Sequence, residues 1–85
     1  MIDRKLVEIL RCPVTREKLT VLAKDRLRTL NAAIEAGDLR HADGRKVETP
    51  LEEGLVTADG SRIYAVRDGI PIMLADEAIL AGPAP

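Results

Sequence analysis

Aromatic side chains are almost absent from this sequence. Tyr64 is the only aromatic residue among 85, with no Phe and no Trp. Sites for single-stranded nucleic acid usually stack bases on several aromatic rings, so this chain is poorly equipped for that role. Its core must be built from aliphatic side chains, and seven Ile, eleven Leu and six Val suffice for a small one.

Cysteine and histidine are nearly missing as well. The single cysteine, Cys12, excludes an internal disulfide and an all-cysteine metal site. We expect it to be a small buried hydrophobe, or else a reactive thiol whose pKa is lowered by Arg11 and Arg16. His41 stands alone in a polar segment, so we interpret it as a solvated loop residue.

Long apolar runs and an excess of one charge are also absent. Every apolar segment is far shorter than the roughly 18 residues of a membrane span, and residues 1–5 lack the apolar run of a secretory signal. Thirteen basic and fourteen acidic residues are intermixed, for a net charge of −1. The sequence therefore predicts a soluble cytoplasmic protein without an overall attraction to nucleic acid or anionic membranes.

Capping residues and periodicity predict two helices. Asp3 is a suitable N-cap for a short first helix, which must stop before Pro13. Helical spacing recurs over residues 24–36, and Gly37 follows as a C-terminal cap. The apolar positions of this second helix are Leu27, Leu30, Ala33 and Ile34. One or two helical turns are expected over residues 75–80, and fraying over residues 81–85.

The remaining β-prone runs predict a small antiparallel sheet, and with it an α+β fold. The strongest signal is the run from Arg62 to Leu74, in which Arg67-Asp68-Gly69 separates two apolar segments as a tight turn. Further strands are expected at residues 19–22 and 55–57, with at most a minor one near residues 46–47. Asp59-Gly60 predicts a second hairpin turn.

The residues of catalytic chemistry are missing. Glu52-Glu53 and Asp76-Glu77 are interpreted as solvated faces, and there is no serine elbow, phosphate-cradling loop or acidic metal cluster. We predict that the chain is not an enzyme and holds no cofactor. Five basic residues in the first eighteen leave one alternative open, a small RNA-contacting module, although nearby acidic residues dilute that patch; they are Arg4, Lys5, Arg11, Arg16 and Lys18.

Cys12-Pro13-Val14-Thr15 has the shape of a zinc knuckle without its second thiolate. Structural zinc sites use four N or S ligands, commonly from two Cys-x-x-Cys pairs. The second pair would fall on Thr57 and Gly60, neither of which can replace a cysteine. We therefore predict that no metal is bound.

Two motifs together resemble the Trm112p-like family. They are the opening Leu6-x-x-Ile9-Leu10-x-Cys12-Pro13 and the block Asp68-Gly69-Ile70-Pro71-x-Met73-Leu74. That family comprises a small zinc-ribbon activator subunit shared by tRNA, rRNA and release-factor methyltransferases, together with short bacterial relatives. The resemblance implies one domain over residues 1–85, with ribbon halves at about 1–23 and 51–80 and a helical insertion at about 24–50.

The resemblance also implies a non-catalytic role. Zinc-bearing relatives cover an apolar surface of a methyltransferase and extend its sheet, while the enzyme carries the S-adenosylmethionine and does the chemistry. Carried over, the ligand positions are Cys12, Thr15, Thr57 and Gly60, so this chain keeps one of the four. The implied fold is a zinc-ribbon-like sheet without zinc, and the implied partner is a methyltransferase of the translation machinery.

The residues and the resemblance agree on one candidate partner-binding site, an apolar edge strand formed by Ile70, Pro71, Ile72, Met73 and Leu74. Pro71 has no N–H, which confines this strand to a sheet edge or to pairing on one side. A partner's strand could add beside it, and the thioether of Met73 suits an irregular contact. We expect Ile70 and Ile72 on one face and Pro71 and Met73 on the other. The alternative is that these side chains only fill the chain's own core.

Overall fold

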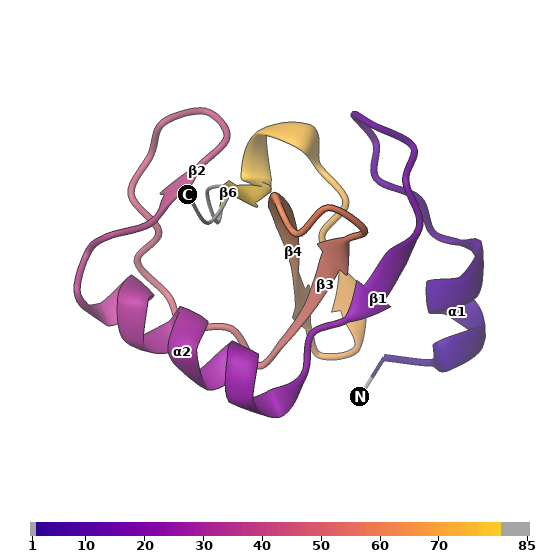
Figure 1. Cartoon of the computed structure of the whole chain (residues 1–85), viewed down its shortest axis with the longest axis horizontal. Helices are drawn as coiled ribbons and strands as arrows, with labels where there is room; N and C mark the ends of the chain where they lie inside the picture. Colours follow the sequence, from indigo (N-terminus) through magenta and orange to yellow (C-terminus); the bar gives the residue numbers. More distant parts are fainter. Residues whose placement is uncertain (1, 81–85) are drawn as a thin grey trace.

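A computed structural model describes residues 2–80 and has the predicted α+β class. Figure 1 shows the elements in chain order, coloured from the N-terminus to the C-terminus. They are α1 (Arg4–Ile9), β1 (Leu19–Val21), α2 (Lys24–Glu35), β2 (Arg40–His41), β3 (Glu53–Thr57), β4 (Arg62–Arg67), β5 (Ile70–Pro71), the 3₁₀ turn η1 (Ala75–Glu77) and β6 (Ile79–Leu80).

The described strands form one antiparallel sheet with the order β1-β3-β4-β6-β2, and β5 pairs separately with β4. The β3–β4 hairpin is its centre, and its loop contains the predicted Asp59-Gly60 turn. The next turn is formed by Asp68 and Gly69, whose φ angles are 53° and 75°. Positive φ at two successive residues matches the twist of a tight hairpin, so β5 folds directly back onto β4.

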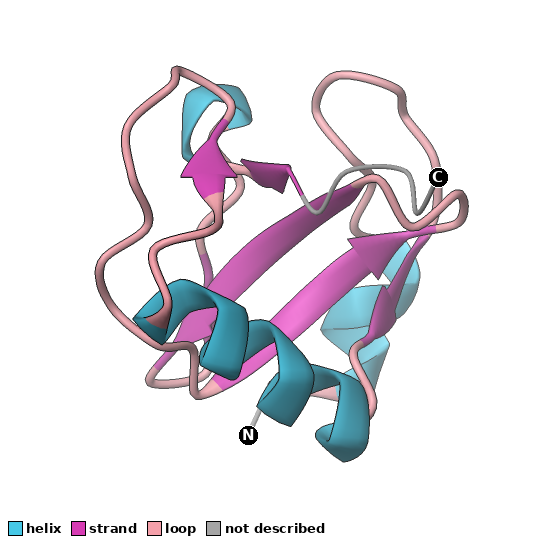
Figure 2. Cartoon of the chain, turned by 60° about the vertical axis from the view of Figure 1, so that its left-hand side comes forward, coloured by secondary structure: helices cyan, strands magenta, loops and turns pink. Residues whose placement is uncertain are grey.

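The two helices cover opposite faces of the sheet. Neighbouring side chains of a strand point to opposite faces, and β4 accordingly directs Tyr64 to one apolar cluster and Ile63 to another. The first cluster contains Val7 of α1 and the second contains Leu30 and Ile34 of α2. Figure 2 shows α2 lying across the long strands. The second helix therefore packs on the sheet and does not project from it.

Each helix has its predicted cap at one terminus, Asp3 at the start of α1 and Gly37 after the end of α2. The Asp3 carboxylate accepts a hydrogen bond from the Lys5 N–H at 2.8 Å. At the end of α2, Gly37 has a φ of +81°. Gly37 and Asp38 donate their N–H groups to the carbonyls of Ile34 and Ala33, both at 3.0 Å, which is the Schellman arrangement. Capping chemistry read from the sequence therefore locates both helices.

The predicted helical turns over residues 75–80 were right only in part. Residues 75–80 form only the short turn η1 before becoming the strand β6, because Ile79 pairs with both Ile63 of β4 and His41 of β2. At most a minor strand was expected near residues 46–47, and Lys46 there forms a single bridge to Arg40 of β2, a strand that was not predicted. The predicted fraying of residues 81–85 lies outside the described residues.

Helices of membrane-spanning length and apolarity do not occur in the part of the chain that the structure describes.

Candidate functional site

The predicted edge strand lies at an open side of the sheet. Ile70 and Leu74 are 62% and 58% exposed, among the large apolar side chains that this chain leaves at its surface. Pro71, Ile72 and Met73 are half-buried. Beyond β6 the sheet continues into β2, but no strand among residues 2–80 pairs with the outer side of β5.

The backbone of this segment alternates between the sheet and the open side. The Ile72 N–H donates to the Ala65 carbonyl of β4 at 2.9 Å, and Ile70 is the Cα partner of Arg67. Because backbone groups in a strand alternate in direction, the backbone of Pro71 and Met73 faces away from β4. The nitrogen of Pro71 thus lies on the open side. Its lack of an N–H therefore costs no hydrogen bond to β4. The groups available there are the carbonyl of Pro71 and the N–H and carbonyl of Met73.

The side chains of the segment lie on both faces of the sheet. Met73 packs against the apolar cluster that contains Tyr64 and α1. Ile72 lines a cavity of about 450 Å³ on the α2 face, together with Ala65 and Ile79. These two side chains are partly used by the chain's own core, whereas Ile70 and Leu74 remain exposed. That the segment binds a partner stays a prediction.

The first position of the predicted zinc ligand set is occupied by a buried thiol. Cys12 is 1% exposed, and its Sγ lies 2.9 Å from the hydroxyl of Tyr64. Burial opposes ionisation of this thiol, but hydrogen bonds from the Thr15 side chain and N–H, from Tyr64 and from the Val14 N–H outweigh burial and lower its pKa to about 7. The loop therefore still directs donors at a sulfur atom, as a zinc knuckle does.

The second pair of positions is held by a network of hydroxyl and carboxylate groups. The buried Thr57 hydroxyl donates to the Asp59 carboxylate at 2.7 Å and accepts from the Arg62 N–H at 3.2 Å. Asp59 also accepts from the N–H and the hydroxyl of Ser61. Hydrogen bonds from the Ser61 N–H, the Thr57 hydroxyl and the Ser61 hydroxyl lower the pKa of Asp59 to about 2.

These four positions do not fit a zinc ion. Only Cys12 offers a thiolate, the Thr57 hydroxyl is already engaged, and Gly60 has no side chain. The Thr15 hydroxyl already accepts from the Glu17 N–H at 3.3 Å. Zinc in structural sites requires four N or S donors in a tetrahedral array, and this donor set supplies one.

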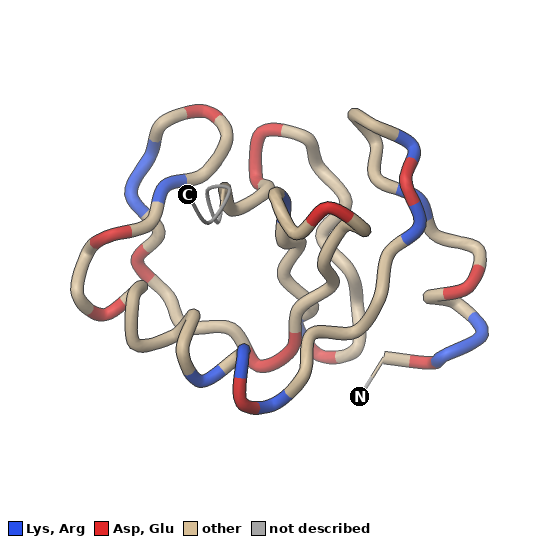
Figure 3. The backbone as a smooth tube through the Cα atoms, in the orientation of Figure 1, with Lys and Arg blue, Asp and Glu red and all other residues tan. Residues whose placement is uncertain are grey.

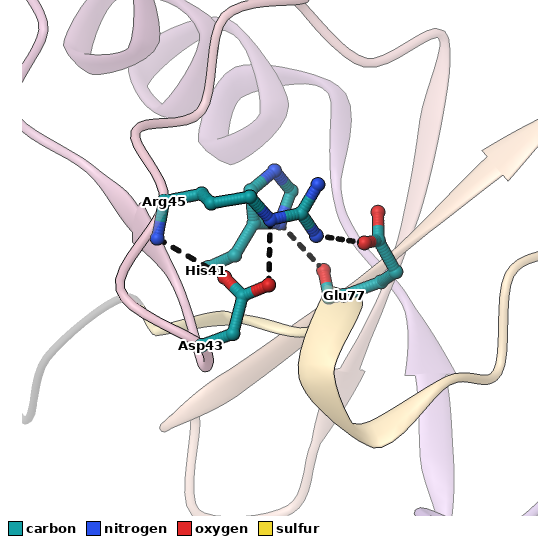
Figure 4. Close-up of polar contacts among 4 residues, drawn as sticks. All are labelled: His41, Asp43, Arg45 and Glu77. Atoms are coloured by element: carbon teal, nitrogen blue, oxygen red, sulfur yellow. Dashed lines mark hydrogen bonds and ion pairs between the residues drawn. The ribbon is translucent and has the colours of Figure 1, made fainter.

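A third polar group joins β2 to η1, and it corrects the prediction for His41. Figure 4 shows the contacts. His41 is half-buried in β2, and its Nδ1–H donates to the Glu77 carbonyl at 2.8 Å. Arg45 forms ion pairs with the carboxylates of Asp43 and Glu77. His41 is therefore a structural residue and not a solvated loop residue.

Two of the four carboxylates expected on solvated faces are also engaged. Glu53 accepts a hydrogen bond from the Ile2 N–H at 3.1 Å, and Glu77 pairs with Arg45. The carboxylates of Asp43, Asp76 and Glu77 can approach within 4.8 Å of one another, but the Arg45 guanidinium already neutralises part of their charge. No local sequence pattern predicts these contacts, because their partners lie 32 to 51 residues apart in the chain.

The basic residues of the first eighteen positions are exposed and interspersed with acidic ones. Figure 3 shows blue and red segments alternating along α1 and the loop that follows. The acidic members are Asp3, Glu8 and Glu17. The single aromatic ring, Tyr64, is fully buried and cannot stack on a base.

Comparison with known proteins agrees with this architecture. The family model described as Trm112p-like protein matches residues 3–69. A UPF0434 protein from Maricaulis maris is 43% identical over 77 residues, which cover 91% of this chain and 79% of that protein. A UPF0434 protein from Anaplasma phagocytophilum is 35% identical over 78 residues, covering 92% and 72%.

A solved structure supports the same conclusion. The solution NMR structure of XF2673 from Xylella fastidiosa superposes with a TM-score of 0.74 at 39% identity, covering 93% of this chain and 81% of that one. The match of the family model extends from the N-cap of α1 through the tight turn before β5. On these grounds the chain belongs to the Trm112p-like family.

Proposed function

We propose that this chain is a non-catalytic adaptor that binds and stabilises or activates a cytoplasmic S-adenosylmethionine-dependent methyltransferase of the translation machinery. The enzyme would add one of its strands beside β5. Membership in the Trm112p-like family supports a small adaptor module. The methyltransferase as partner, its tRNA, rRNA or release-factor substrate and the docking segment at residues 70–74 are the finer parts of the proposal.

The open backbone of Pro71 and Met73 carries this proposal. An extended strand that pairs there gains main-chain hydrogen bonds, and these bonds do not depend on the side chains of either protein. Ile70 and Leu74 flank the open backbone with exposed apolar surface. Such a combination on an edge strand is an aggregation hazard unless another chain covers it.

The surrounding structure favours a partner strand that pairs beside β5 and leaves β5 in place on β4. The tight Asp68-Gly69 turn and the bond from Ile72 to Ala65 hold the segment against β4. The partner therefore meets a segment that is already extended, which reduces the ordering cost of binding. Met73 can adjust its unbranched side chain to the contact.

Affinity purification of the tagged chain at native expression level tests this proposal. We expect a methyltransferase to be enriched, as identified by mass spectrometry. The double variant Ile70→Asp with Leu74→Asp places two charges in the docking segment and should reduce recovery of the enzyme by about tenfold or more. Ile9→Asp is the matched control, because Ile9 is 74% exposed on α1 and lies outside the segment.

Two outcomes would contradict the proposal. One is recovery of free chain without any enriched methyltransferase. The other is an enzyme that is recovered equally well by the wild-type chain and by the double variant, since the contact would then lie elsewhere. Circular dichroism of both variants establishes that a loss of binding is not a loss of fold.

A further inference from the structure

The sheet has a second open edge, at β1. The Leu22 N–H donates to the Gly54 carbonyl of β3 at 2.8 Å, and Val21 is the Cα partner of Leu55. Alternation along an antiparallel pair then turns the backbone N–H and carbonyl of Val21 away from β3. Within residues 2–80, the residues before β1 form a single bridge between Lys18 and Arg11. This bridge does not extend to Val21.

A groove runs beside this edge, between β1 and α1. Its volume is about 710 Å³, which exceeds that of the cavity beside Ile72. Its apolar walls come from Ile2 and Val7 on one side and from Leu19 and Val21 on the other. Val21 is 45% exposed although it lies in a strand. The groove therefore offers apolar surface directly next to unpaired backbone.

The polar rim of the groove carries positive charge without ion-pair partners among the described residues, and of its three cations the Arg11 guanidinium donates to the backbone carbonyls of Glu8 and Leu10. Arg4, Arg11 and Lys18 line it, and none of the three forms an ion pair with a carboxylate of the described residues. Of the two acidic residues that also line the groove, Glu53 accepts a hydrogen bond from the Ile2 N–H. Three cations thus line the groove with two carboxylates, Glu8 and Glu53, which leaves an excess of one positive charge, and Figure 3 shows basic and acidic segments alternating on this side of the molecule.

We propose that the groove between α1 and β1 binds an extended acidic peptide, which adds as a new strand at Val21. The main chain of the peptide would pair with the N–H and carbonyl of Val21. Its acidic side chains would face Arg4, Arg11 and Lys18, and the alternate side chains would enter the apolar groove. This site is independent of the docking segment at residues 70–74, so the domain would present two edges to two polypeptides.

Other occupants fit these features less well. A second copy of the chain would bring identical cations together across the symmetry axis, which is unfavourable. Single-stranded RNA would match the cations, but it would make little use of an apolar wall or an open strand edge. The buried ring of Tyr64 cannot serve as a stacking platform.

An NMR titration with defined probes tests the site. The probe is a blocked hexapeptide of alternating Glu and Val, and alternating Lys and Val and a uridine hexanucleotide are the comparison probes. We expect the acidic peptide alone to shift the amide signals of residues 18–21 and of α1. The double variant Arg4→Glu with Lys18→Glu should weaken binding by about tenfold. The matched control, Lys24→Glu with Arg28→Glu on the exposed side of α2, should leave the affinity unchanged.

A backbone variant separates strand addition from charge attraction. Val21→Pro removes the outward N–H without removing a bond to β3 and should abolish binding while Arg4 and Lys18 remain. Equal binding of the basic peptide, binding of the oligonucleotide alone, signal shifts confined to residues 70–74, or an unchanged affinity of the charge-reversed variant would each overturn the proposal. The charge-reversed variant gives this answer even where Val21→Pro fails to fold.

Discussion

The two loops at the zinc-ligand positions, residues 12–15 and 57–60, are held in shape by different means. The first combines local hydrogen bonds, such as that from the Arg16 N–H to the Cys12 carbonyl at 2.8 Å, with a distant contact between Cys12 and Tyr64, which lie 52 positions apart in the chain. The second is local, since the Asp59 carboxylate collects its hydrogen bonds from Thr57 and Ser61. One loop therefore gains its Tyr64 contact only in the folded sheet, whereas the other can form completely together with the β3–β4 hairpin.

The same two loops differ in backbone strain. Arg16, which follows the first loop directly, has a φ of 63°, although a side chain disfavours that conformation. In the second loop the corresponding positive φ, 77°, falls on Gly60, where it costs little. The distant contact of Cys12 thus stabilises a strained turn, and the local network stabilises a relaxed one.

Loss of the Tyr64 side chain should have the largest effect on the first loop. Tyr64→Ala removes a fully buried ring from the core and should reduce the free energy of unfolding by about 3–5 kcal/mol. Tyr64→Phe removes only the hydroxyl that meets Cys12 and should cost about 1 kcal/mol. Urea denaturation measures both values. Amide shifts of Tyr64→Phe that are as large in residues 57–60 as in residues 12–15 would contradict the separation of the two loops.

The thiol of Cys12 should make stability depend on pH. Its pKa is about 7 in the folded chain against a usual value of 9.0, so between these values the unfolded chain binds more protons. Stability should therefore rise from pH 7 to pH 9, by on the order of 2 kcal/mol, and this contribution is lost as the pH falls through 7. Urea midpoints across this range measure it. Cys12→Ala should show a flat profile, and an equal rise in that variant would disprove the assignment.

The hydroxyl of Thr57 should govern the second loop. Thr57→Val keeps the shape of the side chain but leaves the Arg62 N–H without its acceptor, and should cost about 1–2 kcal/mol. It also removes one of the hydrogen bonds that lower the pKa of Asp59, so that pKa should rise from about 2. A carboxyl NMR titration follows this change. An unchanged Asp59 pKa would show that Ser61 alone holds the loop.

Substitutions at the two positions with positive φ, Arg16 and Gly60, should have the smallest effect on stability. Gly60→Ala forces a side chain into positive φ at a position with open space around it, so only backbone strain of about 1 kcal/mol is expected. Arg16→Gly relieves such strain while adding freedom to the unfolded chain, and the net change should stay below about 1 kcal/mol. Thermal unfolding compares the two variants. A larger loss for Arg16→Gly than for Gly60→Ala would reverse the assignment of strain.

The sequence predicted the elements whose signals are local. Asp3 and Gly37 located both helices, and Asp68-Gly69 located the turn before β5. The short strands β2 and β6 were not predicted, because each has two residues and acquires its conformation only by pairing with distant segments. Residue patterns predicted the α+β class and the incomplete zinc knuckle, and the family resemblance added the zinc-ribbon-like architecture.

The candidate site was likewise predictable only where its signals are local. The missing N–H of Pro71 predicted that β5 lies at a sheet edge. In the structure the nitrogen of Pro71 faces the open side, away from β4. The contacts of Cys12, His41 and Glu53 could not be predicted, because each joins residues more than 30 positions apart. Tertiary contacts of this kind leave no periodic or spacing signal in a single sequence.

Hydrogen exchange at the Met73 amide, in the complex with the recovered methyltransferase, tests the docking proposal most directly. Pairing of a partner strand beside β5 should slow this exchange by about tenfold or more relative to the free chain. The Leu22 amide, already bonded to Gly54, should exchange at the same rate in both states. A methyltransferase that stays bound while the Met73 amide exchanges as fast as in the free chain would contradict the account.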